Sequence, residues 1–408
     1  MRKNDPFSYR AQSVTETILA DIDSLSKPMR KFLSTLFAQW WCVLGRYNFI
    51  NMSRFMSYSE QGLRNGFERE IDFLQINKQV VLKNCSCEII LAFDPSFIAK
   101  SGKKTYGLGH YWSGKDQKTK KGLELGCLSA VDVKNETGFH LEAIQTPAMQ
   151  ERKRQKITLI DHYRDFILGR AEELKEISKY VTVDGYFMKK DFILPLVETG
   201  FAVITKMRAD ANLTYIYNGE QKKGKGRKRK NGGKVNWKKL DLDKWKKVFT
   251  TKKEACYTAQ LHCIALKRNV RIVYYLNRET GKHVVFLSTD IQMDAHRVLK
   301  YYRLRFQIEF LIRDGKQHSG LEDCQGRSQK KLNTHFNMAL TNISLAKAEY
   351  YLSIPKNERG SFSLQDIKRQ QHNRLIANFI FSNLGVDLNC KKIKRLYHQC
   401  TNFGRMAA

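Results

Sequence analysis

The sequence predicts an α/β protein in which a mixed β-sheet core follows a helical N-terminal segment and is interrupted by a β-rich insertion. Apolar residues recur at helical spacing through the first 88 residues. Beyond them, short apolar runs of strand-like composition alternate with helical stretches, and several of these runs end in an aspartate. Three strands followed by alternating helices and strands are typical of an α/β fold with a mixed sheet.

Residues 1–88 are expected to form a helical DNA-binding domain. Ser13 is followed three residues later by a glutamate, which is the pattern of a capping box, and is expected to begin a helix. Ser59, with Gln61 and Arg64 behind it, resembles the start of a recognition helix that contacts DNA. A plain helical bundle would show the same apolar periodicity, so both interpretations stay open.

Residues 89–207 are expected to form the first part of the core. The first three strands are predicted to pair as an antiparallel meander. A helical stretch over about 150–178 and a helix near Met188–Glu198 separate the later strands. The expected strands are 88–94, 122–133, 138–147, 180–184 and 201–207.

Residues 208–283 differ in composition from the core and are expected to form the β-rich insertion. Short strand-like segments surround a run of lysine, arginine and glycine, which predicts a loop that either binds the DNA backbone or is a solvated linker. A strand over 283–290 and a helix over 294–314 return the chain to the core, whose second part is 284–350, and 351–408 is expected to be a helical region. The cations of the run are Lys222, Lys223, Lys225, Arg227, Lys228, Arg229 and Lys230.

The charge of the chain points to a polyanionic partner. Lys and Arg outnumber Asp and Glu by 72 to 40, which gives a formal charge of +32, and nucleic acid matches this excess better than an anionic membrane surface does. No apolar run of 18 residues occurs, and the first ten residues lack the apolar core of a signal peptide, so a cytoplasmic setting is expected. The nine scattered cysteines lack the spacing of zinc ligands, which predicts reduced thiols.

Four polar residues lie at helical spacing in an otherwise apolar segment. Steps of three, four and seven residues place Tyr302, Arg305, Glu309 and Lys316 within a stripe about 60° wide on a helix. A carboxylate between cations on such an apolar helix is unfavourable unless a metal ion or a phosphate uses it. An Arg305–Glu309 salt bridge is the simpler alternative. Gly315 predicts that the helix ends just before Lys316, which would remove that lysine from the stripe.

Two aspartates form a candidate metal site together with Glu309. Asp94 ends the run EIILAFD and Asp184 ends YVTVD, and strand ends are where an open α/β sheet presents ligand-binding groups. Three acids from separate elements can hold two divalent ions that activate an attacking oxygen and stabilise the leaving one, and Mg²⁺ prefers such oxygen ligands. A strand-end aspartate is, however, more often a turn residue. The rival acids are Asp132, Asp161, Asp165, Asp290, Glu322 and Asp323.

The stripe and the aspartates together resemble the bacterial insertion-sequence transposases of family four. The family signature Y-(2)-R-(3)-E-(6)-K is matched at every position by Tyr302, Arg305, Glu309 and Lys316. Asp184 lies in DGYF, which is similar to the family's second-aspartate motif, and Asp94 follows the first core strand as the family's first aspartate does. Because these are DDE transposases, the resemblance implies an RNase H-like core, with 208–283 as the β-rich insertion that family members carry.

The resemblance implies a DNA transposase. Such an enzyme cuts transposon ends with activated water and joins the freed 3′-OH to target DNA, in some members through a hairpin intermediate. The implied partners are the terminal inverted repeats and the target DNA, bound by a homodimer at the nucleoid of a bacterial cytoplasm. Two alternatives stay open: a DNA-binding relative without catalytic activity, and an RNase H-like nuclease that cuts but never joins strands.

The resemblance also implies roles for the site residues. The acids that would hold two Mg²⁺ ions, for which Mn²⁺ can substitute, are Asp94, Asp184 and Glu309. The residues that would grip phosphates of the transposon end are Tyr302, Arg305 and Lys316. Lys206 and Arg208 follow a core strand and are, with the cationic run, candidate phosphate contacts. Trp237 and Trp245 either stack on a flipped base or are structural, and the structural role is the favoured one.

Overall fold

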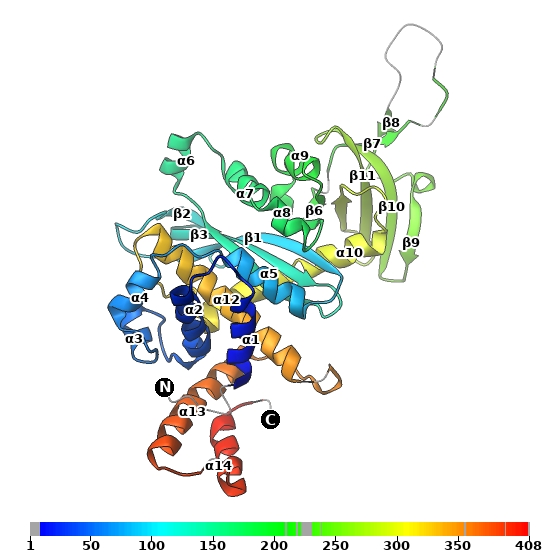
Figure 1. The fold of residues 1–408 in the computed structure, drawn as a ribbon. Helices are drawn as coiled ribbons and strands as arrows, with labels where there is room; N and C mark the ends of the chain where they lie inside the picture. Colours follow the sequence, from blue (N-terminus) through cyan, green and yellow to red (C-terminus); the bar gives the residue numbers. More distant parts are fainter. Residues whose placement is uncertain are drawn as a thin grey trace.

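A mixed β-sheet runs through the whole molecule, with helices on both of its faces (Figure 1). The computed structural model describes residues 9–208, 210–217, 219–221, 231–237, 239–354, 356–387 and 389–406. The N-terminal and C-terminal helices lie on the same side of the sheet, although they are far apart in the sequence. No helix in the described part of the chain is long and apolar enough to cross a membrane.

Five strands form the core of the sheet. They are β1 (Ile89–Ala99), β3 (Lys118–Asp132), β4 (Thr137–Gln145), β5 (Tyr180–Val183) and β6 (Ala202–Met207). The first three pair as an antiparallel meander, as predicted, while β5 and β6 run parallel to β1. The resulting order β4–β3–β1–β5–β6 confirms the expected RNase H-like mixed sheet.

The prediction that Asp94 ends its strand is wrong. Strand β1 continues through Asp94 and Pro95 to Ala99, and Asp94 lies opposite Cys127 of β3. The parallel partner β5 ends earlier, with Val183 opposite Phe93. Beyond that point β1 is an edge on one side, where a proline without an N–H is tolerated. Asp94 is therefore the first residue of β1 that has no partner on β5.

The insertion extends the core sheet. Its strands are β7 (Leu213–Ile216), β8 (Asn231–Lys234), β9 (Lys246–Thr250), β10 (Glu254–Cys263) and β11 (Arg268–Asn277). Strand β12 (His283–Ser288) pairs with β6 on one side and with β11 on the other, so the sheet is continuous across the two regions. The cationic run from Lys222 to Lys230 lies outside the described residues.

The N-terminal region is helical, as predicted. The helices are α1 (Tyr9–Ala20), α2 (Lys27–Gln39), α3 (Phe49–Ser53), α4 (Glu60–Gly66) and α5 (Phe73–Asn84). The predicted helix start at Ser13 is wrong, because the chain is already helical from Tyr9. Ser59 does cap α4, but Arg64 on that helix is bound to Glu60 at 2.6 Å.

Helices on the two faces of the core give neighbouring residues of β1 different surroundings. Helices α6 (Met149–Gln155), α7 (Leu159–Leu168), α8 (Ala171–Lys175) and α9 (Lys190–Glu198) follow β4 and β5. Tyr163 of α7 packs on Phe93 of β1, with ring centroids 5.0 Å apart. Because side chains alternate along a strand, Asp94 faces the opposite side, where α5 and the helices after β12 cover the sheet.

The helix predicted over 294–314 is two helices. Helix α10 (Ala295–Leu304) and helix α11 (Gln307–His318) are separated by a tight turn. The amides of Phe306, Ile308 and Glu309 bond to carbonyls three residues earlier, and this 3₁₀-type bonding tightens the turn. The remaining helices are α12 (Gln329–Ser353), α13 (Leu364–Asn383) and α14 (Lys391–Asn402).

The expected end of this helix before Lys316 is also wrong. Helix α11 continues through Gly315 to His318. A Cβ on Gly315 would lie 3.0 Å from Leu340 of α12 and 3.2 Å from Leu321, so the glycine permits a close approach of the two helices. Packing against α12 thus offsets the low helix propensity of glycine.

Candidate active site

Three carboxylates from separate elements form one cluster, in which Asp94 and Glu309 contact the same guanidinium group. Asp94 lies on β1, Asp184 directly follows β5, and Glu309 lies in the first turn of α11. Arg305, in the turn before α11, places Nη2 2.8 Å from Oε1 of Glu309 and Nη1 3.6 Å from Oδ1 of Asp94. Tyr302 reaches Asp184 from α10, with its hydroxyl 3.5 Å from Oδ1. The Arg305–Glu309 salt bridge of the simpler interpretation is therefore present, as one edge of this larger cluster.

Sheet register explains why the two aspartates are neighbours. In the parallel pair of β1 and β5, Phe93 lies beside Val183. The next residue on each strand is an aspartate, so Asp94 and Asp184 leave the sheet at the same edge. Both carboxylates are close enough for the charge of Asp184 to raise the pKa of Asp94.

The environment of Asp94 disfavours its ionised form. The pKa of Asp94 is raised to about 7, mainly by burial; the charge of Arg305 opposes this shift, and the charges of Glu309 and Asp184 add to it. The side chain of Asp94 is 23% exposed. A cation bound beside this buried carboxylate would favour its ionised form.

Arg305 has unused hydrogen-bonding capacity. Its side chain is only 11% exposed, yet Nε and Nη1 are buried and have no hydrogen-bond partner among the described residues, since the 3.6 Å to Asp94 is too long for one. A buried unpaired donor costs free energy. Guanidinium donors in a fixed fork fit the oxygens of a phosphate.

Tyr302 and Lys316 are held on either side of this arginine. The Tyr302 ring packs on Phe286 of β12, with centroids 4.9 Å apart, and burial raises the pKa of Tyr302 to about 12, so its hydroxyl keeps its proton at neutral pH. Lys316 donates to the carbonyl of Phe97 on β1 at 2.5 Å and lies 3.7 Å from Glu322. The four stripe residues thus remain along one side of the site although the helix is broken.

The donor chemistry of the cluster fits a hard divalent cation. All three acids offer carboxylate oxygens, with neither thiol nor imidazole among them, and such ligands suit Mg²⁺ or Mn²⁺. Within the described residues, no group of three Asp, Glu, His or Cys side chains is arranged closely enough to hold a metal ion as it stands. The guanidinium of Arg305 occupies the position between Asp94 and Glu309.

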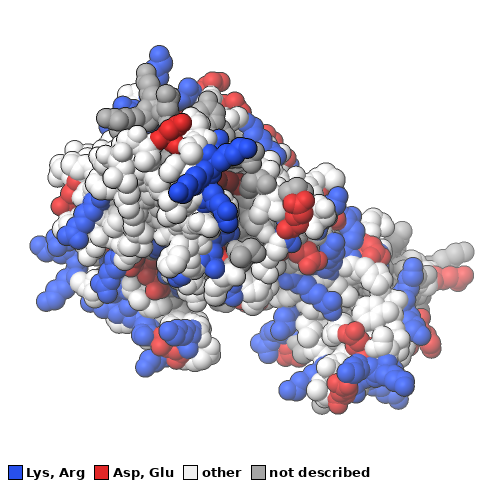
Figure 2. Space-filling model, turned by 90° about the horizontal axis from the view of Figure 1, so that it is seen from below, with Lys and Arg blue, Asp and Glu red and all other residues white. Residues whose placement is uncertain are grey.

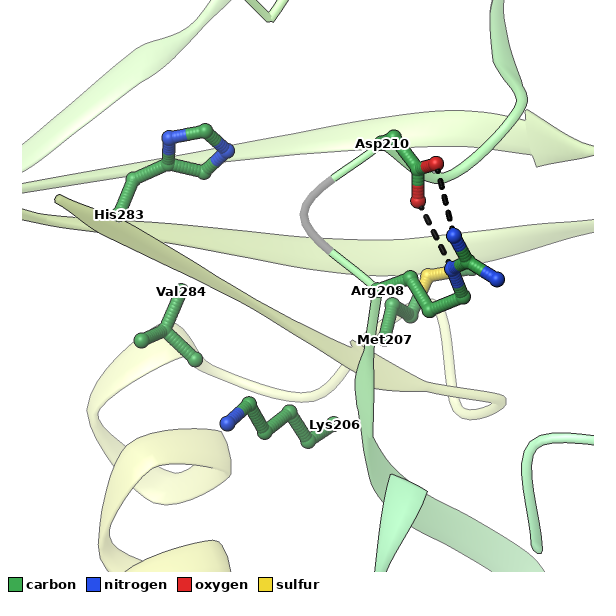
Figure 3. A pocket seen from close by; sticks show the side chains of 6 residues that line it. All are labelled: Lys206, Met207, Arg208, Asp210, His283 and Val284. Atoms are coloured by element: carbon green, nitrogen blue, oxygen red, sulfur yellow. Dashed lines mark hydrogen bonds and ion pairs between the residues drawn. The ribbon is translucent and has the colours of Figure 1, made fainter. Parts of the chain in front are cut away.

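Lys206 and Arg208 line a separate pocket of about 470 Å³ (Figure 3). Lys206 lies on β6, and a Cβ on Gly185 would be 3.0 Å from its carbonyl oxygen, so it is close to Asp184. Arg208 instead turns to Asp210, with contacts of 3.0 and 3.1 Å. The structure therefore places the backbone of Lys206 next to the residue that follows Asp184, and Arg208 in an exposed ion pair.

The rival acids have other partners. Asp132 accepts bonds from Ser86 and Asn135, and Asp161 forms the capping box of α7. Asp323 accepts from the amide of Tyr47, while Glu322 is the neighbour of Lys316, which the sequence pattern did not indicate. Spacing alone could not separate these acids from the three that converge.

The tryptophans considered in the insertion are packed. Trp237 donates from its indole to the carbonyl of Ala211 at 2.7 Å and stacks on Tyr274, with ring centroids 6.0 Å apart. Trp245 is 5% exposed and donates to the hydroxyl of Tyr215. Both contribute to the core of the insertion.

Cationic side chains are spread over the face seen in Figure 2, on the main body and on the lobe beside it. A formal charge of +32 over such a surface attracts polyanions through the summed field. Nucleic acid is a polyanion of this kind.

A comparison with known protein families agrees with this geometry. The family model described as the transposase DDE domain matches residues 86–345, well over half of the chain, and this span contains Asp94, Asp184 and Glu309. No curated protein matches the chain. Fold, carboxylate cluster and family model together lead to one conclusion: the chain belongs to the transposase DDE domain family.

Proposed function

We propose that this protein is an active DNA transposase of the bacterial insertion-sequence family four. It cuts DNA at the terminal inverted repeats of its element and joins the freed 3′-OH to target DNA. The observation that carries this proposal is the proximity of Asp184 and Glu309 to Asp94, with Arg305 between Asp94 and Glu309. Its natural setting is the nucleoid of a bacterial cytoplasm, where both DNA substrates are present.

In this proposal the three carboxylates hold two Mg²⁺ ions, for which Mn²⁺ can substitute. When bound, the ions supply the Lewis acidity that activates water or a 3′-OH and stabilises the leaving oxygen. The raised pKa of Asp94 supports this assignment, because a carboxylate whose ionised form is disfavoured by burial and by two neighbouring acids would gain stability from a bound cation.

The cations beside the acids position the DNA strand. Arg305 offers two unpartnered donors to a phosphate next to the cut, and the protonated hydroxyl of Tyr302 is a further donor. Lys316 contributes a point charge at the far end of the stripe, and Lys206 contributes one near Asp184. We also include Arg208, the cationic run over 222–230 and the domain formed by residues 1–88 among the DNA contacts.

We further propose that the enzyme acts as a homodimer on DNA. Helix α13 and its C-cap residue expose large apolar side chains at helical spacing, which are Ile376 (46% exposed), Phe379 (71%), Ile380 (46%) and the C-cap Leu384 (68%). The stretch from 375 to 384 contains no charged residue, so two copies of a strongly cationic chain can meet there without direct charge repulsion. An exposed apolar patch of this kind is typical of an interaction surface.

The test is cleavage and strand transfer on the element's own terminal repeats in Mg²⁺. Glu309→Gln and Asp184→Asn are each expected to abolish both reactions while leaving DNA binding intact, because they remove a metal-binding charge and little volume. Asp165→Asn on α7, an exposed carboxylate away from the site, is the matched control and should retain activity. Normal cleavage by Glu309→Gln would refute the assignment, and cleavage without any joining by the unaltered protein would favour a nuclease.

A further inference from the structure

An exposed tryptophan lies on a hairpin that the sequence pattern did not indicate. Strand β2 (Gly109–Ser113) pairs with the first residues of β3, and Trp112 lies opposite Thr119 while His110 lies opposite Lys121. Directly paired residues point to the same face of an antiparallel pair. Trp112, which is 57% exposed, therefore shares one face of the hairpin with Lys121.

The other tryptophans of the chain have structural positions. Trp40 and Trp41 are buried in the N-terminal helices, and Trp237 and Trp245 are packed in the insertion. A single exposed apolar residue needs no explanation by itself. The surroundings of Trp112 are what set it apart.

The hairpin and the loop before it are strongly cationic. Residues 100–122 contain seven lysines and a single acid, Asp116. That acid is already engaged, because its carboxylate accepts from Ser113 at 2.6 Å and lies 3.1 Å from Lys120. Four lysines of this segment are exposed and form no ion pair with a described residue, and these are Lys103, Lys104, Lys115 and Lys118.

The opposite face of the hairpin is anchored. Tyr111 is buried, and its hydroxyl lies 2.9 Å from the carbonyl of Gly107 and 3.2 Å from that of Thr146. Lys121 donates to the carbonyl of Gly102, which ties the preceding loop to the hairpin. Trp112 is therefore presented from a fixed stem.

The hairpin borders the active site. Strand β3 continues from the hairpin to Cys127, the partner of Asp94. Gly122 of β3 pairs with Gly109 at the start of the hairpin, and two residues further along β3, Glu124 pairs with Phe97, whose carbonyl accepts from Lys316. A strand held by Lys316 would meet the hairpin as it leaves the site.

We infer that the β2–β3 hairpin binds DNA beside the active site, with the Trp112 ring stacked on an unpaired nucleobase and lysines of the hairpin and of the loop before it on the neighbouring phosphates. Bases inside a duplex stack on one another, so a freely presented indole finds its partner where a strand end is unpaired. Aromatic stacking of this type is tolerant of sequence. The inference rests on the proposal that DNA is the substrate, and it adds a contact outside the carboxylate cluster and the stripe.

The experiment is a metal-free titration of the full-length protein with two fluorescent DNAs, a blunt duplex and the same duplex with a short single-stranded tail. Trp112→Ala is expected to weaken binding of the tailed DNA about tenfold, since stacking has roughly that effect per base, and to change binding of the blunt duplex little. Trp112→Phe should restore most of the affinity. Met149→Ala on α6, another exposed apolar side chain (59%), is the control and should bind as the unaltered protein does.

Intrinsic fluorescence gives a second measurement. Because the other tryptophans are packed, tailed DNA should quench the emission of the unaltered protein strongly and that of Trp112→Phe weakly. Equal affinity of Trp112→Ala and unaltered protein for the tailed DNA would overturn the inference, as would an equal loss on both DNAs. If the unaltered protein bound neither DNA, the proposed function itself would fail, which is a distinguishable result.

Discussion

Replacing Asp94 by asparagine should stabilise the metal-free protein at neutral and alkaline pH. The pKa of Asp94 lies at about 7 in the fold, against an ordinary value of 3.8. A carboxyl whose pKa is raised by folding binds its proton more tightly in the folded state, so its contribution to stability is complete below pH 4 and is lost as the pH rises through 7. Asparagine has nearly the same shape and cannot ionise.

The size of the effect follows from the pKa difference. About three pKa units correspond to about 4 kcal/mol at most, at about 1.4 kcal/mol per unit. Asp94→Asn should therefore unfold at higher urea concentration than the unaltered protein at pH 8 in a chelator, with the two proteins converging near pH 4. Adding Mg²⁺ should stabilise the unaltered protein by mass action and leave the variant nearly unchanged.

Asp132, in the same sheet, is a control whose pKa is shifted in the opposite direction. Burial acts to raise the pKa of Asp132, but hydrogen bonds from Ser86 and Asn135 hold that pKa below its usual range. Asp132→Asn should thus destabilise the protein at neutral pH, with an effect that shrinks as the pH falls below 4. If Asp94→Asn lost stability with rising pH as steeply as the unaltered protein, the electrostatic account of the site would be refuted.

Three further substitutions test the packing at Gly320, the proposed dimer interface and the proposed phosphate contact of Arg305. Gly320→Ala should lower the free energy of unfolding by about 1–3 kcal/mol, seen as a lower melting temperature, because φ is +70° and a Cβ would lie 2.3 Å from the ring of Tyr47. Phe379→Asp should shift the protein on DNA from dimer towards monomer in light scattering, and an unchanged mass would exclude α13 as the interface. Arg305→Lys should reduce cleavage more than DNA affinity, since the ammonium cannot replace the guanidinium fork; equal losses would argue for a binding role alone.

Local patterns in the sequence were sufficient for most of the secondary structure. Alternation and apolar runs predicted β1, β3 and β4 as a meander, and the helical period predicted a helical N-terminal region. The prediction that Tyr302, Arg305, Glu309 and Lys316 share one side also agrees with the structure, although the helix is interrupted at Arg305. Steps of three, four and seven residues keep side chains on one side even across a single tight turn.

The sequence did not predict the elements whose formation depends on contacts with residues far away in the chain. The short strand β2 contains a glycine and pairs with the lysine-rich start of β3. Neither segment shows a local apolar alternation that would predict this pairing. The continuation of β1 beyond Asp94 depends on β3, whose fifteen residues supply partners on that side. The continuation of α11 through Gly315 depends on close contact with α12.

The sequence by itself determined the chemical inventory: three acids on separate elements, the cationic stripe, the overall charge and the order of strands and helices. Only the tertiary structure decided which of the many acids converge, because strand register and helix packing join residues that are hundreds of positions apart. It likewise decided which tryptophan reaches solvent, since burial depends on what the rest of the chain places over each ring. Trp112 is exposed, whereas Trp237 and Trp245 are covered by their own domain.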